Sequence, residues 1–221
     1  MLYYGCMEIL VFIIYIIVFL YSVIFHEIAH GLVANKFGDD TARISGRISL
    51  NPLVHIDIFG SVLFPLLLYL SSGMAFGYAK PVPVNPYRLK NGKVSYRLVA
   101  LAGVVTNLLL AIIAALVLNL ALKIFGLNLD NLGVIFFAYV LNLNLILAIF
   151  NILPLPGFDG FNFLTTFDWF TKFISRTPLA NPLFMLQYGL LVSLLLLMVF
   201  MPIINNIFVF VFNLFARIFG L

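Results

Sequence analysis

Charge is scarce in this 221-residue chain: 9% of its residues are charged, against 64% hydrophobic and 16% aromatic. A typical soluble domain is about a quarter charged. The scarcity excludes an ordinary soluble enzyme, a nucleic-acid-binding protein and a disordered chain. The single cysteine, Cys6, excludes an internal disulfide and a cysteine-based zinc site. What remains is an integral membrane protein whose main solvent is lipid.

Long apolar runs alternate with short basic loops. The runs suited to helices are 9–35, 98–122, 132–150, 183–201 and 203–219, the last two separated at Pro202. The sequence therefore predicts an all-α polytopic membrane protein with about five to six transmembrane helices. We expect a single domain over 1–221, with a core at about 9–165 and C-terminal helices at about 183–219.

The apolar segment 58–70 is shorter than the other runs and has Pro65 inside it. A spanning helix needs roughly 20 apolar residues, so we expect a re-entrant or extended segment near 58–86. The basic loops 36–57 and 71–97 then lie on the same side, which the positive-inside rule makes the cytoplasm. We expect a multi-pass protein of the cytoplasmic membrane.

The first apolar run ends in His26 and His30, with Glu27 between them. The i, i+4 spacing places both imidazoles on one helical face, where they can bind zinc. Glu27 is placed to take a proton from a zinc-bound water. An ordinary polar helix end is the alternative. Ionisable groups at membrane depth are costly and usually functional, which favours the zinc site.

A hydrolytic zinc site usually has three protein ligands and an open position for water. The candidates for the third ligand are His55, Asp57, Asp159 and Asp168. Asp159 lies in a loop broken by Pro154 and Pro156, so its carboxylate can turn back into the protein. If segment 58–70 is re-entrant, the chain crosses the membrane twice between His30 and Asp159, through the runs 98–122 and 132–150. His30 and Asp159 then both lie near the cytoplasmic side. A plain Asp-Gly turn is the alternative, but the nearby histidines favour Asp159 as a ligand.

The motif His26-Glu27-Ile28-Ala29-His30 is joined by an Asn-x-x-Pro-x-Pro-x-x-Asp-Gly pattern at 151–160. Together they resemble the site-2 protease family of intramembrane zinc metalloproteases. The segments 51–57 and 77–86 look like its compact bacterial and archaeal branch, which has no appended soluble domains. The resemblance implies one zinc ion per chain, bound by His26, His30 and Asp159. It also implies that Glu27 is the general base and that Asn151 stabilises the reacting carbonyl; a helix C-cap is the alternative for Asn151.

Three prolines in 80–86 exclude a regular helix there, so this segment should be extended. The resemblance favours a substrate-lining edge over a stiff loop. The substrate-binding residues it implies are Lys80, Pro81, Val82, Pro83 and Val84, with Asn107 as a further candidate from a weaker match at 102–107. For His55, a role in orienting its loop through hydrogen bonds is favoured over a ligand role.

The expected function is a zinc metalloendopeptidase that hydrolyses peptide bonds within or near transmembrane segments. It would serve regulated intramembrane proteolysis or the clearance of signal remnants. The expected partners are substrates with a transmembrane helix and membrane lipid, with no nucleic acid. A zinc-binding membrane transporter and a non-catalytic scaffold remain as alternatives. The apolar runs 98–122, 132–150 and 183–201 lack the ionisable residues of an ion path, and the intact Glu27 disfavours a scaffold.

Overall fold

The computed structural model describes residues 2–57, 63, 70 and 80–221. The expected re-entrant segment 58–70 therefore lies almost entirely outside the described residues. Within them, four helices are long and apolar enough to cross a membrane, and no strand is present. They are α1 (Leu2–Lys36), α4 (Lys93–Asn119, continued by a π-helical turn over Leu120–Ile124), α5 (Leu132–Asn151) and α8 (Pro182–Phe219). The predicted all-α polytopic membrane class is confirmed.

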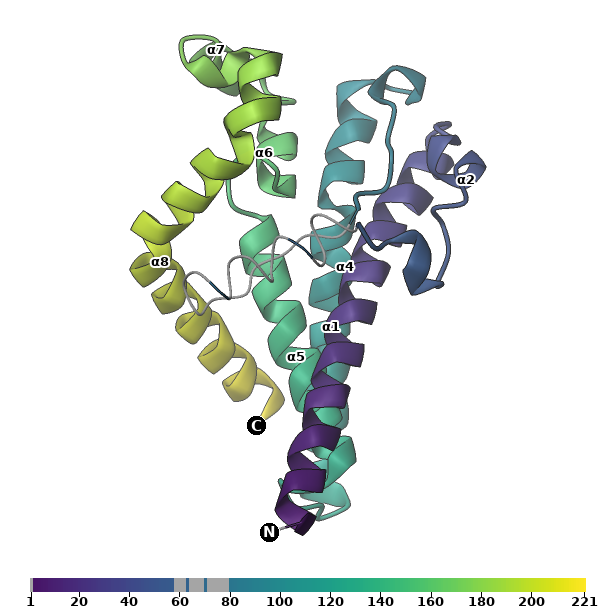
Figure 1. Cartoon of the computed structure of the whole chain (residues 1–221), viewed down its shortest axis with the longest axis vertical. Coiled ribbons are helices and arrows are strands. Elements are labelled where there is room, and N and C mark those ends of the chain that lie inside the picture. The colour runs from purple at the N-terminus through teal and green to yellow at the C-terminus, as the bar shows by residue number, and fades with distance from the viewer. Residues whose placement is uncertain (1, 58–62, 64–69, 71–79) are drawn as a thin grey trace.

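The C-terminal region differs from the prediction of two helices separated at Pro202. One continuous helix, α8, runs through that proline and bends along its length (Figure 1). Proline removes one backbone donor and kinks a helix, but membrane helices tolerate it where the apolar run continues on both sides. The two helices predicted at 183–201 and 203–219 are therefore one helix in the structure.

Helix α4 packs between α1 and α5 and forms the centre of the bundle (Figure 1). Its small residues Ala111, Ala114 and Ala115 are fully buried against Leu141 and Leu145 of α5. Small residues allow helix backbones to approach closely, which is how membrane helices gain packing contacts. The C-terminal half of α8 packs its phenylalanines on the same cluster. These contacts set the positions of α1, α4 and α5 around the site described below.

The short helices gather at one end of the bundle (Figure 1). They are α2 (Thr41–Ile44), η1 (Pro52–Val54), η3 (Pro86–Arg88), α6 (Asp159–Leu164), α7 (Asp168–Ile174) and η5 (Pro178–Ala180). Helices α1 and α5 finish and α4 starts near this end. The end of α1 and the start of α6 therefore share one depth, as two crossings between them require.

Residues 80–85 are extended, as their prolines predict. The Lys80 amide donates to the carbonyl of His55 at 2.9 Å, and the Asn85 amide donates to Asp39 Oδ2 at 2.6 Å. Asp39 is fully buried and also accepts the amide and hydroxyl of Thr41 on Oδ1. Burial opposes ionisation, but these hydrogen bonds and the nearby Arg88 hold the Asp39 pKa below its usual value.

Asp39 should therefore stabilise the fold at neutral pH and lose this effect in acid. Because its pKa is lower in the folded protein, its contribution is complete above the ordinary aspartate pKa of about 3.9 and declines as pH falls below it. Asp39→Asn should lower the free energy of unfolding at pH 7, since an amide NH₂ would face the Asn85 donor. The difference from wild type should shrink below about pH 4.

Thermal unfolding in detergent across this pH range measures the effect. Asp40→Asn is the matched control, since Asp40 pairs with Arg88 where both side chains are exposed. Exposed pairs contribute about 0–1 kcal/mol, so this variant should stay close to wild type. A difference between Asp39→Asn and wild type that persists unchanged at pH 3 would contradict the prediction.

Candidate metal centre

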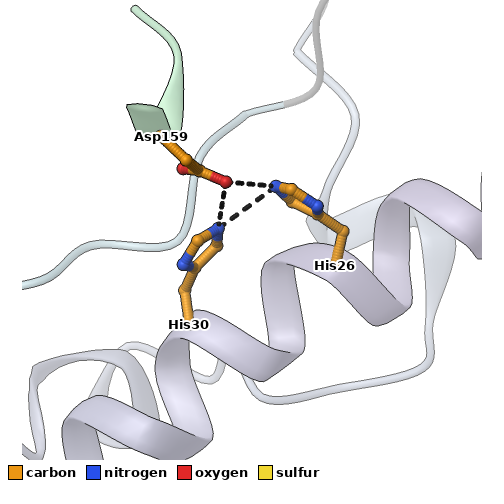
Figure 2. Close-up of side chains that lie close together, drawn as sticks. All are labelled: His26, His30 and Asp159. Atoms are coloured by element: carbon orange, nitrogen blue, oxygen red, sulfur yellow. Dashed lines mark hydrogen bonds and ion pairs between the residues drawn. The ribbon is translucent and has the colours of Figure 1, made fainter. Parts of the chain in front are cut away.

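Three potential ligand atoms converge at the end of the bundle that holds the short helices. Nε2 of His26 and Nε2 of His30 lie 3.1 and 3.3 Å from Asp159 Oδ2, and 3.1 Å from each other (Figure 2). Both histidines are buried, and Asp159 is half-buried. The structure thus brings together the three residues that the sequence singled out as ligands.

Local sequence explains how each ligand reaches this point. His26 and His30 are one turn apart on α1, and their rings project from the same face (Figure 2). Asp159 is the first residue of α6, after the loop broken by Pro154 and Pro156. Gly160 lets this loop fold back, because a Cβ there would lie 2.6 Å from the Leu153 carbonyl oxygen. The loop therefore delivers the carboxylate to the histidines.

Hydrogen bonds to the Nδ1 atoms of the two histidines determine which tautomer each imidazole adopts, and therefore what each Nε2 atom directs toward Asp159. His30 Nδ1 lies 2.7 Å from the Val99 carbonyl, which can only accept, so Nδ1 carries the proton. His26 Nδ1 lies 2.5 Å from Asn107 Oδ1, another acceptor. In the neutral imidazoles, both Nε2 atoms then direct lone pairs at the carboxylate. The two Nε2 lone pairs and the Asp159 oxygen repel one another. Their close approach is therefore favourable only when a cation lies between them.

This donor set fits a metal ion of the zinc type. Two neutral imidazoles and one carboxylate are ligands that Zn²⁺ accepts, and three protein ligands leave a position for water. Asp159 Oδ2 is buried and has no hydrogen-bond partner among the described residues. This oxygen, which faces the two imidazoles, is thus available for coordination.

Glu27 contacts the extended segment that the sequence assigned to substrate binding. The Val82 amide donates to Glu27 Oε2 at 2.7 Å, and Val82 is buried. A Cβ on Gly31 would lie 3.1 Å from Val82 Cγ1, so the segment packs closely on α1 beyond the histidines. Lys80 and Pro81 are exposed, and Pro83 and Val84 are half-buried. Their contact with substrate stays a prediction, but the segment does lie beside Glu27.

Arg47 holds this segment from the other side. It is buried, and its guanidinium donates to the carbonyls of Val54, Lys80 (2.5 Å) and Pro81 (3.1 Å). A planar fork of donors suits several carbonyls at once. Sequence reasoning missed this role because it counted Arg47 among the basic loop residues that orient the protein in the membrane. No local pattern distinguishes a buried loop arginine from an exposed one.

Arg47→Met should loosen the extended segment without touching the metal ligands. Leaving a fully buried carbonyl without a donor costs about 1–3 kcal/mol. The carbonyls that Arg47 binds are partly buried, so the free energy of unfolding should fall by up to this amount. Metal content should remain that of wild type, because no ligand moves. Unfolding in detergent and metal analysis provide the two measurements. Arg43→Met, which changes an exposed arginine on α2, should alter neither, and equal losses in both variants would contradict the assigned role.

The other predicted residues have different places. Asn107 is fully buried behind His26 and bonds its ring, which is not the substrate-lining position that we expected. Asn151 donates its amide to Leu147 in its own helix at 2.9 Å. His55 is buried with Nε2 2.8 Å from the Ser49 carbonyl, as a loop-orienting histidine should be. Asp168, a candidate third ligand, is exposed and pairs with Lys93 at 2.5 Å.

A bundle of membrane helices that presents two histidines, one turn apart, to a convergent carboxylate defines a membrane metalloprotein with the ligand types of a hydrolytic zinc enzyme. Similar proteins are consistent with this class, and their names begin "Putative zinc metalloprotease". Three of them are YwhC of Bacillus subtilis, Rip2 of Mycolicibacterium smegmatis and MJ0611 of Methanocaldococcus jannaschii. The chain belongs to the site-2 protease family of zinc metalloproteases.

The extent of the similarity differs among these relatives. YwhC is 42% identical over 156 residues, which cover 67% of this chain and 66% of YwhC. Rip2 is 31% identical over 70% of this chain and 57% of its own length, and MJ0611 is 34% identical over 71% and 72%. This chain thus spans less than two thirds of YwhC and Rip2. No family model and no solved structure matches the sequence.

Proposed function

We propose that this chain is a zinc-dependent endopeptidase that cleaves its substrates within or near their transmembrane segments. The observation that carries the proposal is the position of Glu27, next to the convergent ligands on a membrane-spanning helix. A carboxylate one residue from the first ligand is placed as the base that a zinc hydrolase needs. An ion path would need further ionisable residues in the spanning helices, and the apolar stretches 98–122 and 132–150 contain no Asp, Glu, His, Lys or Arg. The group of His26, His30 and Asp159 supports one zinc ion per chain.

The proposed chemistry assigns separate tasks to the residues of the site. When bound, zinc supplies Lewis acidity, which lowers the pKa of a coordinated water and polarises a carbonyl. Glu27 accepts the proton of the attacking water and passes it to the leaving amine. Asn151 offers a neutral donor for the developing oxyanion once its amide leaves Leu147. The segment Lys80–Val84 lines the path of an unwound substrate strand.

The distribution of basic residues supports a cytoplasmic position for the site. Those in the loops, the short helices and the adjoining ends of the long helices at the end that carries the site are Lys36, Arg43, Arg47, Lys80, Arg88, Lys90, Lys93, Arg97, Lys172 and Arg176. An excess of Lys and Arg is typical of the cytoplasmic side. We therefore propose the cytoplasmic membrane as the location, with transmembrane-helix proteins and lipid as partners.

Metal removal and restoration test the proposed function. Full-length protein in lipid nanodiscs should cleave a model single-span substrate, lose that cleavage on treatment with a zinc chelator, and regain it when zinc is added back. Mass spectrometry of the fragments locates the cut relative to the apolar segment. Cleavage that is indifferent to the chelator would contradict the proposal. Zinc flux into vesicles without any cleavage would instead indicate a transporter.

A further inference from the structure

Behind His26, four polar side chains form a ring that links three helices. His26 Nδ1 meets Asn107 Oδ1 of α4 at 2.5 Å, and Asn107 Nδ2 donates to Asn144 Oδ1 of α5 at 2.7 Å. Asn144 Nδ2 donates in turn to Ser22 Oγ of α1 at 2.9 Å. Ser22 is one turn before His26 on the same helix face, so the series of three hydrogen bonds begins and ends on α1, and we call these four side chains the ring. Asn107 and Asn144 have no exposed surface, and Ser22 is 4% exposed.

The direction of every hydrogen bond in this ring follows from one carbonyl. The Val140 carbonyl can only accept, and Asn144 Nδ2 donates to it at 2.8 Å. The side-chain oxygen of Asn144 must therefore face Asn107, and Asn107 must donate to it from its NH₂ group. This leaves the Asn107 oxygen facing His26, so His26 donates from Nδ1. Its Nε2 lone pair is then directed at Asp159 and His30.

We infer that Asn144 is a positioning residue of the metal centre, which fixes the His26 tautomer and ring direction through Asn107. Without Asn144, the Asn107 amide can rotate and present its NH₂ group to His26. That orientation favours the tautomer protonated on Nε2, where a metal ion must bind. Leu141 and Leu145 beside Asn144 are buried apolar residues, so they offer Asn107 no acceptor in its place. The inference rests on the proposed zinc site.

Asn142 provides a matched control on the same helix. Its amide donates to the Ala138 carbonyl at 2.9 Å, just as Asn144 donates to Val140 four residues back. Within the described part of the chain, however, no hydrogen bond joins Asn142 to another helix. Asn142 is half-buried, and replacing it removes an amide with the same intrahelical hydrogen bond while leaving the ring intact. A general effect of losing an asparagine from α5 would therefore appear in both variants.

The experiment measures metal affinity rather than turnover. Metal-free full-length protein in nanodiscs is titrated with Zn²⁺ in competition with a chromophoric chelator. Asn144→Leu should weaken binding by about 10- to 100-fold, the range for partners that orient metal-ligating histidines. Asn142→Leu should bind as wild type does. If Asn144→Leu does not fold, Asn144→Ser replaces it: a serine hydroxyl can bond the i−4 carbonyl within the helix but lacks the amide oxygen that orients Asn107.

A double variant separates positioning from packing. Asn107→Asp added to Asn144→Leu places a carboxylate behind His26, and both of its oxygens accept, so rotation cannot present a donor. Affinity should return toward that of wild type, whereas a packing defect at Asn144 would persist. Wild-type affinity in both Asn144 variants, equal weakening in Asn142→Leu, or no rescue would each overturn the inference. If wild type itself binds no zinc, the proposed metal site fails instead.

Discussion

Glu27→Gln should lower the cleavage of a transmembrane substrate by about 10²- to 10⁴-fold, the contribution of a positioned general base. Glutamine has nearly the same shape as glutamate but cannot accept the proton of the attacking water. Glu27 is not one of the three convergent ligand atoms, so zinc content should stay that of wild type. The variant thus separates loss of chemistry from loss of metal.

The structure also indicates why this replacement should leave the fold intact. Glu27 Oε2 accepts the Val82 amide, and the glutamine side-chain oxygen can accept the same hydrogen bond. The extended segment should therefore keep its place beside α1. Unfolding in detergent should show no loss of stability comparable with that of Arg47→Met.

A matched control lies on the same helix. Glu8 is an exposed acid near the start of α1, far along the helix from the histidines. Glu8→Gln removes the same charge from the same helix and should cleave as wild type does. If Glu27→Gln retains full cleavage with zinc bound, the assigned base and the mechanism built on it are wrong.

The three candidate metal ligands were predictable because local rules determine where they lie. A spacing of four residues places His26 and His30 on one helix face whatever the rest of the chain does. Two prolines before Asp159 require a broken loop, and counting the membrane crossings places that loop at the depth of His30. Extended structure over 80–85 followed from prolines in the same way. None of these steps needs knowledge of how the helices pack.

The supporting residues could not be predicted, because their roles depend on packing between distant segments. Asn107 and Asn144 are polar residues in apolar helices, and the sequence indicates only that they need partners. Which partners they meet depends on the rotation of α4 and α5 about their axes. Arg47 reaches the Lys80 carbonyl across 33 residues of sequence. The continuity of α8 through Pro202 likewise depends on what packs against it.

Gly103 is the position where helix packing and the metal site meet most directly. It lies buried in α4 against α1, in the 102–107 stretch that matched the family weakly by sequence. A Cβ at this position would lie 2.5 and 2.6 Å from His26 Nε2 and Nδ1. Real Cβ contacts essentially never come so close, so either the imidazole or the helix must shift.

Gly103→Ala should therefore displace His26 and impair metal binding more than any change in this protein that leaves the ligands themselves unaltered. The affinity for zinc should fall by at least the 10- to 100-fold of an orienting residue, because the ligand itself is moved. Overpacking should also lower the free energy of unfolding of the metal-free protein by about 1–3 kcal/mol. Chelator competition and unfolding in detergent measure the two effects.

Gly189→Ala in α8 is the control that isolates the collision with His26. Gly189 is also a helical glycine, but its nearest neighbour for an added Cβ is Pro156 Cβ at 3.8 Å, an ordinary contact. This variant should keep full zinc affinity and gain about 0.4–1 kcal/mol of stability from the loss of backbone freedom in the unfolded chain. If Gly103→Ala and Gly189→Ala have equal affinity for zinc, His26 can shift to accommodate the added Cβ and still bind the metal. In that case the close approach of α4 would not be what holds this ligand in place.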